Sequence, residues 1–357
     1  MRVARKVLTL LPLTLVLGCG TDFTPPSAIE GLRVLAVRQG DGAITPGSRV
    51  KLSMLLADKR IIGHSDTDPP LELNVAWLAG CNNPPGRQYF ACLPAIRELA
   101  AALGDGSAPP AGVAGKFGMG TDFEVAIPED ILTTAPLVPH DPIHYGVSYV
   151  FFVACTGTPG FDPSITEGIP VTCTTAEGKT VGTSGMVVGF TTLYTYDGEQ
   201  NTDPLLTALD FDGEEMPATL VDHPATSCTT DDDCAPPSGT SFRHPRRCTL
   251  DTRTCAPVIG ACGSGDDCPE IRVTPRIDTQ SVERYTDGYE VMWASYYATS
   301  GALKEDARLV VDRSAGLTGD PTTLWKIPGT KSTSRIWVTV NDQRGGATWG
   351  FFDVAVE

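Results

Sequence analysis

Hydrophobic and polar residues alternate along most of this chain with a period of two. In the first half, the alternation marks residues 32–37, 50–56, 71–77, 125–127, 145–153 and 186–194. A period of two places every second side chain on the same face of a β-sheet, so these segments are predicted to be strands with one buried face. One segment differs, because Ile96, Leu99, Ala100 and Leu103 have helical spacing. They predict one short helix within a long loop.

The strand pattern restarts after Asp197-Gly198. It marks residues 205–211, 271–277, 289–297, 308–311, 323–327, 335–340 and 349–356. Helices long enough to connect parallel strands do not intervene, which favours antiparallel sandwiches over a parallel sheet. We therefore expect an all-β protein with two sandwich domains, residues 30–197 and 203–357.

Two tryptophans occupy similar positions in the two halves. Trp77 and Trp293 each lie on a predicted strand in the early middle of its half. We expect both to fill the core between two sheets, where a large ring buries the most area. Exposed tryptophans that stack on a ligand are the alternative.

Several of these features resemble known envelope modules. The strand spacing, the Pro46-Gly47 turn and residues 341–346 before the last strand resemble immunoglobulin-like (Ig-like) and PKD-like domains of bacterial envelope proteins. The whole chain resembles surface lipoproteins of social soil bacteria. This resemblance implies a β-sandwich architecture and an envelope location, and it implies no activity.

The N-terminus has the composition of an export signal. Arg2, Arg5 and Lys6 precede an apolar stretch, residues 7–17, that is shorter than the ~20 residues a spanning helix needs. Residues 16–19, Val-Leu-Gly-Cys, resemble a lipobox. That resemblance implies a signal peptide at 1–18, a diacylglycerol on Cys19 and a lipidated tether at 19–29. An ordinary secretory signal with an incidental Cys19 is the alternative.

The residue after the cysteine bears on location. Position 20 is Gly rather than Asp, which in the lipoprotein sorting pathways that this chain resembles favours the outer membrane. Whether the protein faces the periplasm or the cell exterior stays open.

Charge limits the possible partners. The chain has 27 Lys and Arg against 43 Asp and Glu, a net charge of −16. Removing residues 1–18 takes away three cations and no acid, which leaves −19. Such a surface repels nucleic acid and anionic lipid, so membrane attachment is expected through acyl chains only, and the remaining partner is an unknown protein or glycan.

The ten cysteines after Cys19 predict five disulfides, as expected in an oxidising compartment. Local pairing groups Cys81 with Cys92 and Cys155 with Cys173. Three more bridges are expected among Cys228, Cys234, Cys248, Cys255, Cys262 and Cys268, in any of 15 connectivities. These six define a disulfide-rich insertion at 222–270, which resembles one complete and one truncated copy of a cystine-rich repeat of secreted bacterial proteins. Zinc is disfavoured by the long spacings.

Three further motifs suggest ligands. Asp210, Asp212, Asp231 and Asp233 are weak calcium candidates, with a solvated acidic turn as the alternative because the full calcium-loop pattern is absent. His140 and His144 have ligand spacing on a helix, but Pro142 between them favours a loop. Gly178-Lys179-Thr180 resembles the end of a phosphate loop, but Cys173 stands where its first glycine would be, which favours a turn.

Nucleophile-elbow and zinc-hydrolase motifs are absent from the sequence. We therefore expect no cofactor and a non-enzymatic binding or adhesion role. An envelope-polymer hydrolase with carboxylates in the long loops 79–121, 156–185 and 222–270 is one alternative, and a structural spacer is another. Deletion of residues 228–268 is expected to leave the second sandwich folded.

Overall fold

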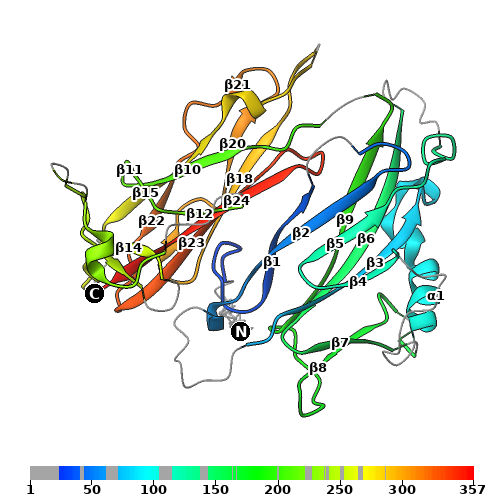
Figure 1. Ribbon diagram of the computed structural model, residues 1–357, viewed down its shortest axis with the longest axis horizontal. Helices are drawn as coiled ribbons and strands as arrows, with labels where there is room; N and C mark the ends of the chain where they lie inside the picture. Colours follow the sequence, from blue (N-terminus) through cyan, green and yellow to red (C-terminus); the bar gives the residue numbers. More distant parts are fainter. Residues whose placement is uncertain are drawn as a thin grey trace, which may run out of the picture.

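The computed structural model describes residues 24–40, 44–61, 71–103, 115–136, 144–162, 164–165, 167–198, 201–221, 227–236, 238, 241–249, 253–263, 268–285 and 287–357. Two groups of stacked sheets lie side by side (Figure 1). Strands dominate both groups, and the predicted all-β class is confirmed.

The first unit contains two main sheets. One has the order β1-β2-β5 and the other β4-β3-β6-β9, all antiparallel. Their strands are β1 (Arg33–Gln39), β2 (Arg49–Ala57), β3 (Asn74–Asn82), β4 (Phe117–Met119), β5 (Asp122–Ala126), β6 (Tyr145–Cys155) and β9 (Met186–Tyr196).

Trp77 fills the space between these two sheets, as the sequence predicts. Its side chain is fully buried and lies 5.9 Å from the ring of Phe123 and 5.7 Å from that of Phe152, centroid to centroid. Its indole nitrogen donates to the Gly120 carbonyl at 2.7 Å, which satisfies the one polar atom of the ring.

A third layer covers the other face of the β3–β6 sheet. It consists of η2 (Pro85–Arg87), η3 (Tyr89–Cys92), α1 (Leu93–Leu103) and the hairpin β7 (Thr158–Phe161) with β8 (Val171–Thr174). The four helical positions predicted from sequence are the buried residues of α1. Burial on both faces explains why ten of the eleven residues of β6 are buried. Two of the excursions predicted as long loops, 79–121 and 156–185, thus contain packed elements.

The second unit also has two main sheets. The smaller has the order β11-β10-β15-β22-β19, and the larger β13-β14-β24-β23-β18-β20-β21, with β12 also paired to β24. The strands are β10 (Leu206–Phe211), β11 (Glu214–Glu215), β12 (Thr219–Leu220), β13 (Arg246–Cys248), β14 (Cys255–Ile259), β15 (Glu270–Ile277), β18 (Met292–Ala298), β19 (Ala302–Leu303), β20 (Ala307–Asp312), β21 (Gly316–Leu317), β22 (Thr323–Lys326), β23 (Ser332–Asn341) and β24 (Ala347–Val356). Short segments complete the described set: η1 (Lys59–Ile61), η5 (Asp231–Cys234), η6 (Thr279–Ser281), β16 (Arg284–Tyr285) and β17 (Gly288–Tyr289).

The tryptophan that fills the second core is Trp325, and the expectation for Trp293 was wrong. On β18 the buried positions are Met292, Ala294 and Tyr296, so Trp293 belongs to the opposite, half-buried face. Trp325 on β22 is fully buried and donates its indole N–H to the Ser300 carbonyl at 2.9 Å. A difference of one residue moves a strand side chain to the other face of its sheet.

The cysteine-rich segment contributes β14 to the larger sheet of the second unit. β14 pairs in parallel with the end of β24, Val258 beside Ala355 and Ile259 beside Val356. Ala256 and Ile259 are buried, and Ile259 belongs to the main core of the unit. The expectation that residues 228–268 can be removed without loss of folding is therefore revised, because their removal would take a strand and a core residue away.

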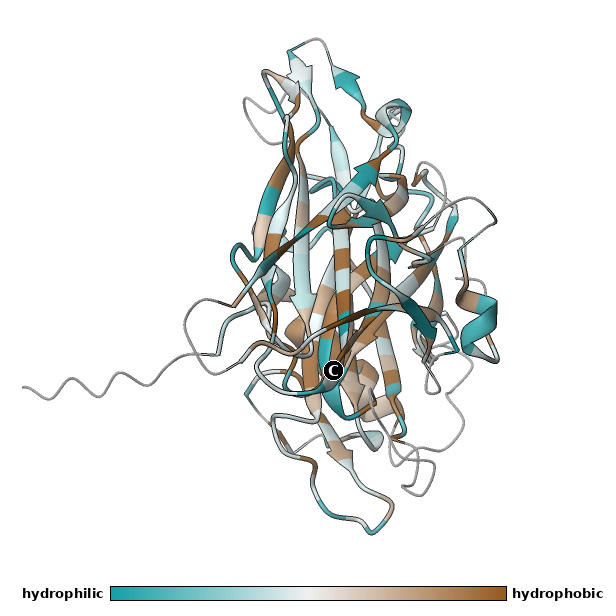
Figure 2. Cartoon of the chain, turned by 90° about the vertical axis from the view of Figure 1, so that its left-hand side faces the viewer, coloured by the Kyte–Doolittle hydropathy of each residue, from teal (hydrophilic) through white to brown (hydrophobic). Residues whose placement is uncertain are grey.

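The two units meet through the outer faces of β1–β2 and of β18–β23–β24. Ile29, Ala57 and Trp337 are buried there, packed against Leu35, Leu55, Tyr297 and Phe351. Residues 27–29, from the segment predicted as a tether, are fixed at this junction: Ile29 N donates to Ala298 O, and Ala298 N to Ser27 O, both at 2.9 Å. Apolar segments recur along the central strands (Figure 2). Helices of the described residues are all too short or too polar to cross a membrane.

Candidate functional site

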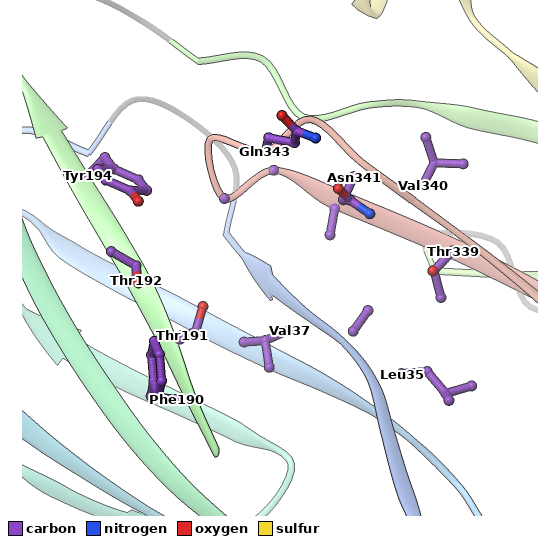
Figure 3. Close-up of a pocket in the computed structure, with 14 residues that line it drawn as sticks. Leu35, Val37, Phe190, Thr191, Thr192, Tyr194, Thr339, Val340, Asn341 and Gln343 are labelled. Atoms are coloured by element: carbon purple, nitrogen blue, oxygen red, sulfur yellow. The ribbon is translucent and has the colours of Figure 1, made fainter. Parts of the chain in front are cut away.

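A cavity of about 350 Å³ opens beside the junction of the two units, between β1, β9 and the turn that joins β23 to β24 (Figure 3). We call it the β9 crevice. Its lining consists of Leu35, Ala36, Val37, Phe190, Thr191, Thr192, Tyr194, Thr339, Val340, Asn341, Gln343, Gly345, Gly346 and Ala347. None of these 14 residues carries a charge, although charged residues make up 20% of the chain. The crevice therefore suits an uncharged group.

β9 presents an unpaired edge to this crevice. Within the described residues, β9 pairs only with β6, and β1 only with β2. The Thr192 carbonyl points away from β6, because it accepts a hydrogen bond from Gln39 Nε2 on β1 at 2.8 Å. Alternation along the strand gives Phe190 and Tyr194 the same outward backbone direction. The crevice is thus bordered by backbone donors and acceptors as well as by side chains.

Aromatic side chains form an exposed rim next to the crevice. Tyr89 is 46% exposed, Phe90 53% and Phe190 39%. The Tyr89 and Phe190 rings stack with centroids 4.5 Å apart, and Phe90 meets Tyr89 edge to face at 5.8 Å. Large apolar rings gathered on a surface are typical of interaction sites, whereas isolated ones are ordinary. The sequence alone does not reveal this rim, because Tyr89 and Phe90 precede Phe190 by about 100 residues in the chain.

A second, larger cavity of about 680 Å³ lies between β1–β2–β5 and the strands β12 and β24. Arg38, Lys51, Ser53 and Asp122 line it from the first unit, and Trp349 from the second. Its charged groups are engaged with one another or with neighbours. Ser53 Oγ donates to Asp122 Oδ1 at 2.6 Å, and Arg38 Nε lies 3.1 Å from Asp203 Oδ2.

A buried acidic cluster lies where the chain passes from the first unit to the second. Glu283 accepts from Thr202 N at 2.6 Å and from Arg344 Nη1 at 2.8 Å, and Asp342 accepts from Asn201 Nδ2 at 2.8 Å. Glu290 is 3% exposed, and its Oε2 has no hydrogen-bond partner.

Burial shifts the proton affinity of this cluster. It raises the pKa of Glu290 to about 8, with the charges of Asp342 and Glu283 adding to the effect. Burial also raises the pKa of Asp342, against the lowering effect of hydrogen bonds from Asn201, Arg344 and Gly346. Glu290 is therefore protonated at neutral pH, and the cluster acts as a structural connection rather than as an open site.

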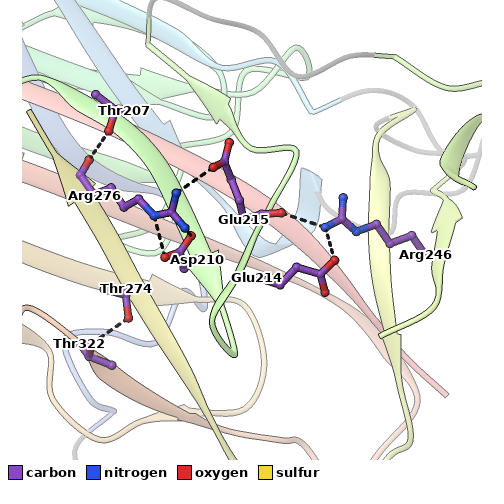
Figure 4. A network of polar contacts seen from close by, with 8 residues as sticks. All are labelled: Thr207, Asp210, Glu214, Glu215, Arg246, Thr274, Arg276 and Thr322. Atoms are coloured by element: carbon purple, nitrogen blue, oxygen red, sulfur yellow. Dashed lines mark hydrogen bonds and ion pairs between the residues drawn. The ribbon is translucent and has the colours of Figure 1, made fainter. Parts of the chain in front are cut away.

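Two of the predicted calcium candidates, Asp210 and Asp212, form ion pairs, and Figure 4 shows that of Asp210. Asp210 forms a two-point pair with Arg276, with N–O distances of 2.8 Å. Asp212 lies 2.8 Å from Arg243 Nε and 3.3 Å from His244 Nε2. On the same hairpin, Glu214 accepts from Arg246 Nη2 at 2.9 Å. Asp212 and Glu214 thus bind basic residues of the cysteine-rich segment about 30 residues further along the chain, whereas Asp210 binds Arg276 on β15.

The other two candidates accept hydrogen bonds from backbone N–H groups. Asp231 accepts from Cys248 N at 2.9 Å, and Asp233 accepts from Thr229 N at 2.7 Å and from Thr230 N at 2.9 Å. These backbone bonds lower the pKa of Asp233 to about 2. In the part of the chain that the structure describes, the one group of three or more potential metal ligands close together is Cys228, Cys234 and Cys255, and all three are in disulfides.

The structure forms five disulfides in the predicted groups. They are Cys81–Cys92, Cys155–Cys173, Cys228–Cys248, Cys234–Cys255 and Cys262–Cys268. Lys179 lies in a turn closed by Thr175 N donating to its carbonyl, next to β8, which is the turn expected for the Gly-Lys-Thr motif. Cys19 and His140 lie outside the described residues, whereas His144 directly precedes β6.

Comparisons with known proteins give little. Family models do not match the chain, and curated proteins do not match it either. Among solved structures, it is similar to the FN1-FN3 domains of chicken CNTN1 with 9% identity and a TM-score of 0.18, over 92% of this chain and 69% of that one. It is also similar to E. coli alpha-2-macroglobulin in its native conformation, with 11% identity and a TM-score of 0.16, over 92% of this chain and 16% of that one. At such scores neither likeness carries an argument.

Proposed function

We propose that this chain is an exported, non-enzymatic recognition protein, held at the outer membrane by a lipid on Cys19, that binds its partner at the β9 crevice and its aromatic rim. One observation carries the binding role: Tyr89, Phe90 and Phe190 gather their exposed rings beside an uncharged crevice with an unpaired strand edge. Aromatic residues are enriched at binding surfaces because they bury a large area at a small entropic cost.

The crevice is also held by a well-packed frame. Its two sides come from different units, and the junction beneath them is a buried apolar cluster with Ile29, Ala57 and Trp337 at its centre. A site between units keeps its shape only if the units do not move apart. Buried packing of this kind lowers the cost of ordering the site when a partner binds.

The hydrolase alternative finds no support in the described loop carboxylates. Asp162 accepts from Ser164 N at 2.9 Å, Glu177 from Thr175 Oγ1 at 2.8 Å, and Asp233 caps the turn at Thr229 and Thr230. Each holds its own loop in shape. Hydrogen bonds from Ser164 lower the pKa of Asp162, and one from Thr175 lowers that of Glu177. A general acid in a glycosidase needs a shift in the opposite direction.

Anchoring is tested by metabolic labelling with a palmitate analogue. We expect the wild-type chain to incorporate the label and the Cys19→Ala variant to lose it. Label that persists in Cys19→Ala would refute lipidation at this residue. Protease treatment of intact cells then separates an exterior from a periplasmic orientation.

Binding is tested with a variant that removes the rim and leaves the fold. The double substitution Tyr89→Ser with Phe190→Ser changes two exposed rings, and Leu317→Ser, also exposed at 45%, is the matched control on the other unit. We expect the purified wild-type chain and the control to bind envelope protein or glycan fractions in a saturable way, and the double variant to bind at least tenfold more weakly. Equal binding by all three would place the site elsewhere, and no saturable binding by any would favour the spacer.

A further inference from the structure

We infer that the larger cavity, of about 680 Å³ between β1–β2–β5 and the strands β12 and β24, is a second binding site that takes a short, uncharged saccharide. This inference does not rest on the proposed function, because the cavity and the β9 crevice share no lining residue. Its volume lies within the about 300–1,000 Å³ of small-molecule pockets, which occur preferentially at interfaces between domains. Both units contribute walls, so a ligand held there would contact both.

The wall from the first unit is a row of polar side chains on neighbouring strands. The strand register places Arg38 of β1 opposite Ser53 of β2, and Ser53 opposite Asp122 of β5. Side chains that lie opposite each other on paired strands share one face of the sheet. Lys51 belongs to the same face by alternation along β2. Hydrogen-bond donors and acceptors therefore converge on one side of the cavity.

These polar groups can bind hydroxyl groups in addition to their present partners. Asp122 uses Oδ1 for both of its contacts, accepting from Ser53 Oγ at 2.6 Å and lying 3.5 Å from Lys51 Nζ. Among the described residues, no such contact engages its Oδ2, which can accept from a ligand hydroxyl. The ammonium of Lys51 can donate to the oxygen of another hydroxyl.

Ion pairing in and around the cavity favours an uncharged ligand. Arg38 Nε lies 3.1 Å from Asp203 Oδ2, and Lys51 pairs with Asp122. A charged ligand would compete with one of these pairs, whereas hydroxyl groups bond to the paired side chains and leave the pairs intact. The net charge of −16 for the whole chain also disfavours an anionic ligand.

The wall from the second unit is mainly apolar. Trp349 of β24 forms it together with Leu220 of β12 and Val221, whose N–H donates to the Trp349 carbonyl at 3.0 Å. Trp349 is 9% exposed, whereas the side chains of Lys51 and Asp122 are 66% and 57% exposed, so the indole lies deeper than this ion pair. A sugar ring carries C–H groups on its faces and hydroxyl groups at its edge. It can place a face against the indole and direct hydroxyls to the polar wall.

The test titrates the purified full-length chain, in detergent, with glucose, galactose, mannose, N-acetylglucosamine and disaccharides built from them, by calorimetry and thermal unfolding. Charged glucuronate and glucosamine are titrated in parallel. The key variant is Asp122→Ala. Its matched control is Glu124→Ala, because the Glu124 side chain lies on the same strand, is 55% exposed and pairs with Arg49 at 2.7 Å, but does not line the cavity.

We expect at least one neutral saccharide to bind wild type and Glu124→Ala alike, to raise their unfolding midpoint, and to bind Asp122→Ala at least tenfold more weakly. Trp349→Leu should also lose at least tenfold in affinity, and Trp349→Phe should lose less. If Trp349→Leu does not fold, the comparison of Asp122→Ala with Glu124→Ala decides.

Three results would overturn the inference: no binding of any neutral saccharide, equal affinity of wild type and Asp122→Ala, or tighter binding of a charged probe. Saccharide binding that is lost in Tyr89→Ser with Phe190→Ser would also overturn it, because the site would then be the rim. That last result would leave the proposed function standing. Conversely, partner binding that ignores the rim substitutions would count against the proposed function and not against the saccharide site.

Discussion

β9 and β24 are long strands of similar length, eleven and ten residues, at comparable places in the two units, and their outer edges are treated differently. The outer edge of β24 is paired with β12 near its start and with β14 near its end, and Glu357 N continues the ladder by donating to Ile259 O at 2.9 Å. Among the described residues, the outer edge of β9 has no ladder partner; β1 lies beside it, with Leu32 N donating to Ser184 O at 3.0 Å just before the strand and Gln39 Nε2 to Thr192 O at 2.8 Å.

This difference assigns a role to the cysteine-rich segment. Unpaired edges promote association between chains, and native proteins cover them or make them unattractive. In the second unit, two disulfides and the ion pairs of Asp212 and Glu214 hold β14 in place as an edge cover. In the first unit, β1 lies beside β9 and is bonded to it near its two ends, but among the described residues no strand forms a ladder with this edge. The cysteine-rich segment thus gives the second unit a paired edge that the first unit lacks.

The largest loss of stability is expected when β14, which covers the edge of β24, is removed. Deletion of residues 228–268 takes away β14 and the buried side chain of Ile259, which together should cost the second unit more than about 4 kcal/mol of unfolding free energy. Thermal unfolding and size-exclusion chromatography should show early melting and association. A deletion of 228–249 with Cys255→Ser keeps the residues of β14 but removes the disulfides and ion pairs that hold it, so its loss of stability should lie between that of the full deletion and that of wild type. A monomer that melts like wild type after the full deletion would contradict the cover role.

The disulfides allow a graded version of the same test. Cys234–Cys255 spans 21 residues and holds β14, whereas Cys262–Cys268 spans 6. From loop length alone, replacing each pair by serine should cost about 3 and about 2 kcal/mol respectively. Cys234–Cys255 also positions β14. Chemical denaturation should therefore show that its replacement costs more unfolding free energy, relative to that of Cys262–Cys268, than loop length alone predicts. Losses that differ only as loop length predicts would show that Cys234–Cys255 acts on the unfolded chain only.

A pair of proline substitutions compares the two edges directly. Thr192 and Ala355 both direct their backbone outward, the first to the crevice and the second to β14. We expect Ala355→Pro to cost about 1–3 kcal/mol, because it leaves a ladder partner unsatisfied, and Thr192→Pro to cost less than about 1 kcal/mol. Thr192→Val and Ala355→Ser control for the side chains. Similar losses in both variants would mean that the edge of β9 has a partner.

A pH-dependent effect concerns the acidic connection between the units. Burial raises the pKa of Glu290 to about 8, above the value near 4.3 of an unfolded chain. The folded state then holds a proton that the unfolded state releases, so this contribution to stability is complete below about pH 4 and is lost as the pH rises to about 8. The slope is at most about 1.4 kcal/mol per pH unit. The unfolding free energy of Glu290→Gln, measured by denaturation across pH 5–9, should depend less steeply on pH than that of wild type. Parallel curves would refute the raised pKa of Glu290.

Local patterns predicted much of this fold. The period of two located the main strands, and the helical spacing of Ile96, Leu99, Ala100 and Leu103 located α1, because both patterns record which side chains face a core. Trp77 followed from the same reasoning. The pattern did not decide which face of β18 is buried, and Trp293 was assigned to the core when Trp325 occupies it.

Contacts between distant segments could not be read from the chain. The carboxylate of Asp212 looks like a calcium ligand beside Asp210, but its partner Arg243 lies 31 positions away. Likewise, Ala256 and Ile259 belong to a stretch of few apolar residues, and only the fold shows that they complete the sheet at β24. The rim of Tyr89 and Phe190 is also a product of tertiary structure.

The attachment of residues 27–29 to Ala298 has a mechanical consequence. Ser27 follows Cys19 by eight residue steps, a reach of at most about 28 Å when fully extended. With the proposed lipid on Cys19, a pull on a bound partner would enter the protein at the junction itself. The load would run from the membrane through Ile29, which is bonded to Ala298 of the second unit, into β1 of the first. Such an anchor would load both units together at the place where they meet.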